Sequence, residues 1–163
     1  MRRIRSYEST RYKPEHPRGK YQVDRPESLD VEALRQTMVE KLQSNTVFDD
    51  PAPYSQGMIH AETIWLAGQV PDNTNGEIVG DDIETQTKQA VDNVEFLLEK
   101  AGSSLESVVS VTAYLTDIDD FEAFNDVYGE LFPDPKPART TVAVAGLAVD
   151  ARLELQVTAV VEE

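Results

Sequence analysis

Residues 137–161 decide the fold, and they read Pro137-Ala-Arg-Thr-Thr-Val-Ala-Val144 and then, after a short break, Ala151-Arg-Leu-Glu-Leu-Gln-Val-Thr-Ala-Val-Val161. β-Branched residues crowd the first part, and such residues favour extended backbone. Apolar and polar residues alternate in the second part with a period of two, which is the pattern of a half-buried strand. The stretch therefore predicts two strands, with Arg139 at the start of the first and Glu154 early in the second.

The chain before this stretch adds four strands and two helices to the prediction. Short β-rich runs predict strands at 46–48, 58–60, 63–67 and 108–115. An apolar stripe of helical period predicts a helix that begins at Asp81 or Asp82 and ends at Gly102. A second helix is expected over 121–131 by the same reasoning. The expected order of elements is βββαβαββ.

This order predicts the layers of the fold. Both helices lie within crossover connections, and right-handed crossovers place them on the same side of a sheet. The expected fold class is α+β, a mixed six-stranded sheet with two helices on one face. The bare face, where Val160 is expected, favours a homo-oligomer with sites between subunits. The short link from Val144 to Leu153 permits direct pairing of the last two strands or the skipping of one strand.

The first 43 residues are expected to form an extension to a domain over 44–163. Residues 1–25 are rich in Arg, contain two Pro and few aliphatic residues, a composition typical of disorder. Ser28 is expected to cap a short helix over 29–42, because apolar residues recur there at helical spacing. A targeting peptide and a nucleic-acid-binding arm are alternative interpretations of this extension.

Charge divides the chain unevenly. Nine Lys/Arg and six Asp/Glu in residues 1–37 give +3, whereas six Lys/Arg and 24 Asp/Glu in residues 38–163 give −18, which sums to −15. Such an acidic domain repels phosphate backbones and argues against nucleic-acid binding. It also repels itself at low salt. Adaptation to a high-salt cytosol and an ordinary acidic surface both explain this charge.

Several classes of site and location are excluded or disfavoured. The absence of cysteine excludes disulfides, thiolate metal sites and cysteine nucleophiles. No apolar run approaches the roughly 18 residues of a membrane span, and no signal-peptide pattern opens the chain. The cytoplasm is therefore the expected location. The carboxylates of Asp117, Asp119 and Asp120 lack the spacing of a calcium loop and are expected to cap a helix in solvent.

Six motifs, in order over residues 44–161, resemble the Rid/YjgF family of reactive-intermediate deaminases. They are Ala52-Pro-Tyr-Ser-Gln-Gly57, Leu66-Ala-Gly-Gln-Val-Pro71, Gln86 to Ala101 with Asp92-Asn93, Asp120-Phe121 through Asn125-Asp-Val-Tyr128, Pro137-Ala-Arg-Thr-Thr-Val142 and Leu153-Glu-Leu-Gln-Val-Thr-Ala-Val160. The resemblance implies a chorismate-mutase-like protomer and a homotrimer with three interface sites. It also implies hydrolysis of 2-imino acids, such as 2-iminobutanoate and 2-iminopropanoate, and of their enamine tautomers to 2-oxo acids and ammonia, with no cofactor and no metal.

The resemblance also implies roles for single residues. Arg139 matches the arginine that binds the substrate carboxylate, and a guanidinium suits that task because it donates two parallel hydrogen bonds. Glu154 matches the carboxylate that holds the attacking water, where it can accept or return a proton. The other positions associated with the site are Tyr54, Gly68, Asn125 and Pro137.

Two positions depart from the family pattern, and both bear on the polarity of the pocket. Ala67 replaces a Ser that is common before the Gly-Gln pair, and Thr141 stands where Cys is frequent. Neither change removes a group that the chemistry needs. The substrate preference of this chain is therefore expected to differ from that of other members.

Alternatives to this interpretation stay open. Arg139 could pair with one of the many carboxylates, Glu154 could be a solvated strand residue, and Tyr54 could pack at an interface. A non-catalytic trimer that binds small carboxylates would need Arg139 more than Glu154. An RNA-binding or RNA-cleaving function is disfavoured by the charge. The sequence specifies neither the physiological imine nor which subunit supplies each site residue.

Overall fold

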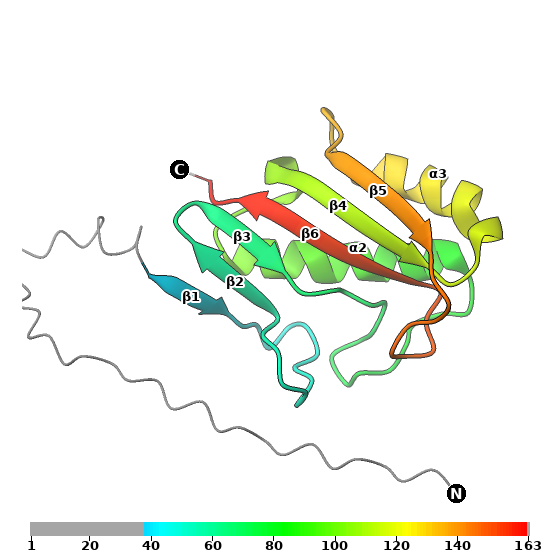
Figure 1. The fold of residues 1–163 in the computed structure, drawn as a ribbon, viewed down its shortest axis with the longest axis horizontal. Helices are drawn as coiled ribbons and strands as arrows, with labels where there is room; N and C mark the ends of the chain where they lie inside the picture. Colours follow the sequence, from blue (N-terminus) through cyan, green and yellow to red (C-terminus); the bar gives the residue numbers. More distant parts are fainter. Residues whose placement is uncertain (1–37, 163) are drawn as a thin grey trace, which may run out of the picture.

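The computed structural model describes residues 38–162, so the predictions made for residues 1–37 lie outside the described part (Figure 1). Its strands are β1 (Val39–Leu42), β2 (Gly57–His60), β3 (Thr63–Leu66), β4 (Val108–Leu115), β5 (Ala138–Ala143) and β6 (Leu153–Val160). The helices are α2 (Ile83–Lys100) and α3 (Phe121–Leu131), with 3-10 turns at Leu105–Ser107 and Ile118–Asp120. The order βββαβαββ agrees with the prediction, but the first strand is formed by residues 39–42 and not by residues 46–48.

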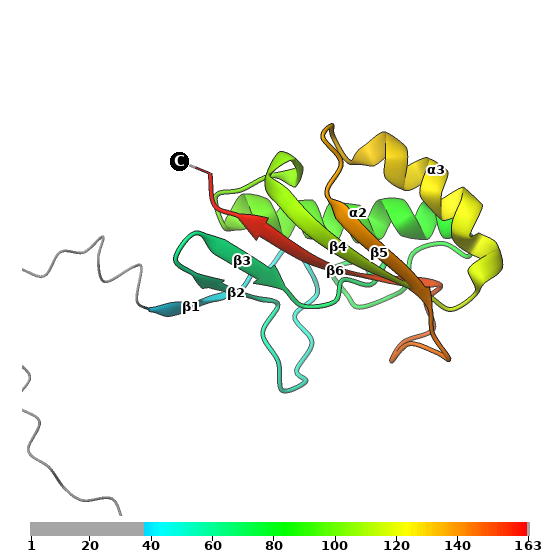
Figure 2. The same ribbon diagram turned by 45° about the horizontal axis from the view of Figure 1, so that its top comes forward.

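All six strands belong to one mixed sheet, in the order β1-β2-β3-β6-β4-β5. Strands β4 and β5 are parallel, and the other neighbours are antiparallel. The last two strands of the chain therefore do not pair directly, because β4 lies between them. Both helices cover one face of the sheet, and the other face is bare (Figures 1 and 2). The predicted α+β class with two helices on one face is confirmed.

The alternation in β6 builds the core. Leu153, Leu155 and Val157 are fully buried on the side of the helices, opposite core residues of β4. The apolar stripe of α2 packs in the same core, which it enters with Ala90, Val91, Val94, Leu97 and Leu98. Each buried aliphatic side chain contributes about 1.5–3 kcal/mol. The polar residues of β6 are left on the bare face.

Strand β1 contradicts the predicted helix over 29–42 in the part that the structure describes, residues 38–42. Residues 39–42 form β1, which pairs antiparallel with β2 and places Leu42 opposite Gly57. The outer edge of β2 offers backbone hydrogen-bond partners that a helix could not use, and Leu42 is buried in the core. The sheet therefore begins at Val39, ahead of the boundary expected at residue 44.

The strand predicted at 46–48 is also wrong, because these residues form a loop. The buried side chain of Gln56 replaces a strand partner there. Its Oε1 accepts from the Ser44 amide at 2.6 Å, and its Nε2 donates to the carbonyls of Ser44, Val47 and Phe48 at 3.2, 3.3 and 3.1 Å. The Gln56 side chain thus supplies hydrogen bonds to this backbone that a neighbouring strand would otherwise supply.

The ends of α2 agree with the prediction. Asp82 caps the helix, because its Oδ1 accepts from the Thr85 amide at 2.7 Å. Gly102 follows the last turn with a φ of 73°, a conformation that favours glycine.

No helix in the described part of the chain is long and apolar enough to cross a membrane.

The acidic cluster before α3 has structural partners. The Asp117 carboxylate accepts from the Asp119 amide at 3.0 Å and so caps the 3-10 turn. Asp120 makes no capping bond and instead accepts two hydrogen bonds from the Arg152 guanidinium at 2.9 and 2.7 Å. This pair ties the start of α3 to the start of β6. The prediction of a capping cluster in solvent is therefore correct for Asp117 and wrong for Asp120, whose carboxylate is mostly buried against Arg152.

The acidic surface predicts that stability depends on salt. The ion pairs found within residues 38–162 are Lys136–Asp134 and Arg152–Asp120, so most carboxylates there have no cation within 4.0 Å. Salt screens their mutual repulsion, since the Debye length falls from about 10 Å at 0.1 M to about 3 Å at 1 M. We expect the melting temperature to rise between these KCl concentrations. A melting temperature that stays constant would leave an ordinary acidic surface as the explanation.

Candidate functional site

Arg139 lies on the side of β5 that faces α3. It pairs in register with Val111, a buried residue on the helix side of β4. Its Nη2 donates to Oδ1 of Asn125 at 2.7 Å. Its Cζ lies 4.4 Å from the ring centroid of Tyr128 and 5.3 Å from that of Phe124. An amide and two aromatic faces therefore hold the guanidinium in place.

The Arg139 guanidinium has no acidic partner within the residues that the structure describes, because no carboxylate oxygen lies within 4.0 Å of it. The pocket around it has a volume of about 410 Å³ and is lined by Asn125, Tyr128, Gly129, Lys136, Pro137 and Arg139. None of these residues is acidic, although the domain carries an excess of carboxylates. We call this group the cationic pocket. It brings three of the predicted site residues together and is suited to a small anion.

Glu154 lies on the bare face of the sheet. It stands opposite Tyr114 in the register of β6 and β4, while its neighbours in β6 point into the core. It borders a hollow of about 380 Å³ together with Gly68, Tyr114 and Gln156. Burial raises the pKa of Glu154 above its ordinary value. A carboxyl group whose pKa is raised toward neutrality is better suited to exchange protons with a substrate.

Gly68 lies directly against the Glu154 carboxylate. A Cβ atom at this position would lie 1.6 Å from Oε1 of Glu154, so any larger residue would have to displace the carboxylate from its place. The next residue holds the chain there, because the backbone of Gln69 exchanges hydrogen bonds of 2.8 and 2.9 Å with that of Leu155. The carboxylate therefore rests directly on the Gly68 backbone.

Tyr54 belongs to the same neighbourhood as Glu154. Its side chain is 51% exposed on the loop before β2. Its pKa is raised, chiefly by burial and then by the charges of Asp50, Asp72, Asp49 and Glu154. This side of the molecule is therefore an acidic surface with a phenol beside it. We call Tyr54, Gly68 and Glu154 the acidic group.

The six predicted site residues therefore form two separate sets. Arg139, Asn125 and Pro137 lie in the cationic pocket on the helix side of β5, and the acidic group lies toward the bare face. Since Arg139 and Glu154 point to opposite faces of one sheet, a single small ligand cannot touch both in one protomer. The two sets can meet on one ligand only across two protomers.

Three residues of the cationic pocket were missed by the sequence reasoning, and two of them, Tyr128 and Lys136, contribute functional side chains; the third is Gly129. Tyr128 lies under the guanidinium, and its hydroxyl is buried without a hydrogen-bond partner in the described part. Burial raises the pKa of Tyr128 to about 12, and the charge of Arg139 acts in the opposite direction. Tyr128 lies three residues after Asn125 on the same face of α3, and this spacing could have predicted that the two side chains share a site. Lys136 is the second residue, next to the predicted Pro137.

The side-chain amide of Asn93 fixes the loop that follows Gly68 of the acidic group. Nδ2 of Asn93, in α2, donates to the carbonyls of Val70 and Asp72 and to Oδ1 of Asp72, each at 3.0 Å. These bonds hold the segment that follows Gly68 against the helix. The Asp92-Asn93 motif is thus explained by support of the loop.

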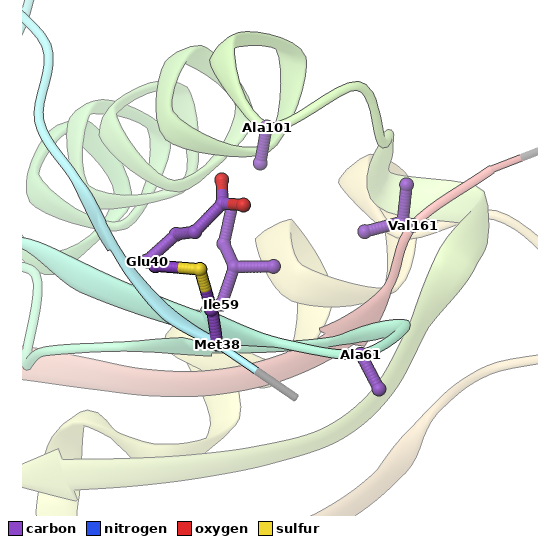
Figure 3. A pocket seen from close by; sticks show the side chains of 6 residues that line it. All are labelled: Met38, Glu40, Ile59, Ala61, Ala101 and Val161. Carbon is purple, nitrogen blue, oxygen red and sulfur yellow. The ribbon is translucent and has the colours of Figure 1, made fainter. Parts of the chain in front are cut away.

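A further pocket, of about 170 Å³, lies at the other end of the sheet (Figure 3). It is lined by Met38, Glu40, Ile59, Ala61, Ala101 and Val161. The Glu40 carboxylate, which Figure 3 shows turned toward Ala101, is the charged group in this lining. The pocket holds neither a cation nor a predicted site residue, so we do not assign the chemistry to it.

Comparison with known proteins gives consistent matches. Residues 46–161 match the family described as Endoribonuclease L-PSP. A RutC family protein of Pyrococcus abyssi is 47% identical over 105 residues, which cover 64% of this chain and 83% of that protein. A Dermatophagoides farinae protein named 2-iminobutanoate/2-iminopropanoate deaminase is 38% identical over 111 residues, or 68% of this chain and 87% of that protein. The crystal structure of RidA from the Antarctic bacterium Psychrobacter sp. has a TM-score of 0.72 and 28% identity, covering 75% of this chain and 99% of that one.

The raised pKa of Glu154 predicts a pH-dependent cost in stability. Because the folded state binds this proton more tightly than the unfolded state, stability falls as pH rises from the unfolded pKa, near 4.3, through the folded pKa. Glu154→Gln removes the charge at nearly constant shape. We expect it to raise the melting temperature at about pH 8 and to leave it unchanged at about pH 3. A variant that is less stable at both pH values would contradict this account of Glu154.

Proposed function

This chain belongs to the Rid/YjgF family, and from that premise we propose that it hydrolyses 2-imino acids and their enamine tautomers to 2-oxo acids and ammonia. The proposed substrates include 2-iminobutanoate and 2-iminopropanoate, in agreement with the name of the relative from Dermatophagoides farinae. The observation that carries the proposal is the guanidinium of Arg139, which lies in a pocket without acidic residues and has no carboxylate partner among the described residues.

The substrate carboxylate would bind the free edge of the Arg139 guanidinium. The bond to Asn125 and the contact with Tyr128 fix the plane of the guanidinium, so that its remaining N–H groups are oriented before the ligand arrives. A two-point contact with the carboxylate would also fix the adjacent imine carbon. Such orientation can supply several kcal/mol of the barrier to reaction.

Glu154 would then move the protons of the hydrolysis. A water molecule held by its carboxylate adds to the imine carbon, so that a C–O bond forms and the electrons of the C=N bond pass to nitrogen. Glu154 takes a proton from the attacking water and returns it to nitrogen, which gives the neutral carbinolamine. The proton of the new hydroxyl group then passes to nitrogen, again by way of Glu154, so that the C=O bond forms as the C–N bond breaks and neutral ammonia leaves. The raised pKa of Glu154 suits both the acceptance and the return of a proton.

We propose that each site is completed across two protomers of a homotrimer. The cationic pocket and the acidic group are different surfaces with complementary charge, so their contact is head-to-tail and favours a closed ring. The bare face also presents apolar side chains for burial, namely Trp65, Val142 and Val160. In a ring of three protomers, each of the three interfaces would hold one Arg139 and one Glu154.

A non-catalytic trimer that binds small carboxylates is the second candidate. It is favoured by the cationic pocket, which one protomer contains without any help from Glu154. Binding of 2-oxobutanoate without turnover of any imine would support it. An RNA-directed function, suggested by the family description, is disfavoured by the −18 charge of residues 38–163.

Replacing Arg139 tests the proposed anchor. A dehydratase would generate 2-iminobutanoate from threonine, semicarbazide would trap the free imine, and release of 2-oxobutanoate would be followed. We expect Arg139→Met to lower kcat/KM by roughly 100-fold, because it removes two charge-assisted hydrogen bonds. Arg139→Lys keeps the positive charge but lacks the planar guanidinium, so its kcat/KM should lie between those of wild type and Arg139→Met. Equal rates for wild type and Arg139→Met, with the oligomer intact, would refute the deaminase proposal for this substrate.

Mixed oligomers test whether the site spans two protomers. Arg139→Met and Glu154→Gln subunits, each inactive alone, would be mixed under conditions that allow the oligomers to exchange. An interface with both native residues forms when one protomer of each kind meets in the right order, so roughly a quarter of the wild-type activity should return. Mixing Arg139→Met with wild-type subunits serves as the control. No recovery of activity in exchanged oligomers would refute the proposal that Arg139 and Glu154 share one site.

A further inference from the structure

Lys136 is a second cation in the cationic pocket, and nothing in the proposed reaction of a monocarboxylic imine uses it. Its side chain turns back onto the end of α3, where Nζ donates to the carbonyl of Gly129 at 2.8 Å and to that of Phe132. Carbonyls at the end of a helix carry partial negative charge and hold cations. The ammonium group is therefore fixed at one place on the rim of the pocket.

The carboxylate near Lys136 is only a weak competitor. Nζ lies 3.7 Å from Oδ1 of Asp134, whose side chain is 86% exposed. Exposed pairs of this kind contribute little free energy and are screened by salt. An ammonium group has three N–H donors, and the two helix carbonyls occupy two of them. One donor and most of the positive charge thus remain available to a ligand.

The two cations are held at a defined spacing along α3. Asn125 holds Arg139, and Gly129, four residues later on the same face, holds Lys136. The two residues that hold the cations are therefore about 6 Å apart along the helix axis. The two carboxylates of a four- or five-carbon diacid are separated by a similar length, so such a ligand suits a pocket with two cations arranged in this way. Of the six Lys/Arg in residues 38–163, two line this one pocket.

We propose that Lys136 makes the site selective for 2-imino acids that carry a second carboxylate in the side chain. This inference rests on the proposed deaminase function and names its substrate class. Arg139 would bind the carboxylate next to the imine carbon, and Lys136 would bind the carboxylate of the side chain. A domain with a net charge of −18 repels a dianion, and the positive charge of Lys136 would offset this repulsion inside the pocket. Oxidation of an acidic 2-amino acid to its imine is the class of reaction that would supply the substrate.

The alternative role of Lys136 is purely structural, as the cap of α3. A lost cap would destabilise the helix that carries Asn125 and Tyr128, and it would weaken the reaction with every substrate alike. A specificity role would change the ratio of two substrates instead. The ratio of kcat/KM for a diacid to kcat/KM for a monoacid therefore separates the two roles.

The experiment compares 2-iminosuccinate, generated by an oxidase from aspartate, with 2-iminobutanoate in the semicarbazide assay. We expect wild type to prefer 2-iminosuccinate and Lys136→Met to lower the ratio of the two kcat/KM values roughly tenfold, the effect of one charge-assisted hydrogen bond. Lys136→Arg keeps the charge and should keep most of the ratio. Asp134→Asn removes the carboxylate that competes for Lys136, so it should raise the ratio of kcat/KM for 2-iminosuccinate to that for 2-iminobutanoate.

Each outcome decides between the possibilities. An unchanged ratio in Lys136→Met and Asp134→Asn would overturn the inference, as would turnover of 2-iminobutanoate without turnover of 2-iminosuccinate. Turnover of neither substrate by wild type would instead refute the proposed deaminase function. If Lys136→Met fails to fold, Lys136→Arg and Asp134→Asn still measure the ratio in folded protein.

Discussion

The site depends on the guanidinium of Arg139, which has no carboxylate partner among residues 38–162 because of the side chains that surround it there. In a domain with 24 Asp/Glu and six Lys/Arg, an arginine would ordinarily find a carboxylate. Here the positions within reach are taken by the rings of Tyr128 and Phe124 and by the neutral amide of Asn125. Aromatic faces attract a cation without neutralising it. The result is a positioned positive charge whose remaining donors are left for a ligand.

The same alternation that builds the core divides the site. Leu153 and Leu155 must face the helices, so Glu154 between them must face the opposite side. The parallel pairing of β5 with β4 turns Arg139 toward the helices by the same rule. A protomer with this core cannot bring the two residues onto one small ligand. In the proposed trimer, association of protomers over the bare face would bring the two residues together and complete the site.

Much of the fold could be predicted because its signals are local. The helices α2 and α3 and the strands β4 and β6 follow from periodicity within single segments. The two errors lie where a distant residue decides the structure. Gln56 satisfies the backbone of the loop at 46–48, and β1 forms because the edge of β2 accepts it. No pattern within the segments themselves carries this information.

For the candidate site, the sequence could supply individual residues but not their arrangement in space. Motifs identified Arg139 and Glu154, but their separation depends on which strands become neighbours, and the short link before Leu153 left that order open. The contact between Gly68 and the Glu154 carboxylate, which a Cβ atom would displace, became clear only from the structure. Tyr128 and Lys136 were missed because each acts through a contact between α3 and a segment that follows it.

The acidity of the domain and the anionic nature of the proposed substrate impose opposite demands. A net charge of −18 repels small carboxylates over the distance of a Debye length, and that distance shrinks to about 3 Å at 1 M salt. Contacts inside the cationic pocket act at hydrogen-bond distance, and partly buried pairs are screened much less than exposed ones. High salt would therefore remove the long-range repulsion and preserve much of the short-range attraction. On this argument an acidic surface and an anion site are compatible, provided that the cations are concentrated in the pocket, as Arg139 and Lys136 are.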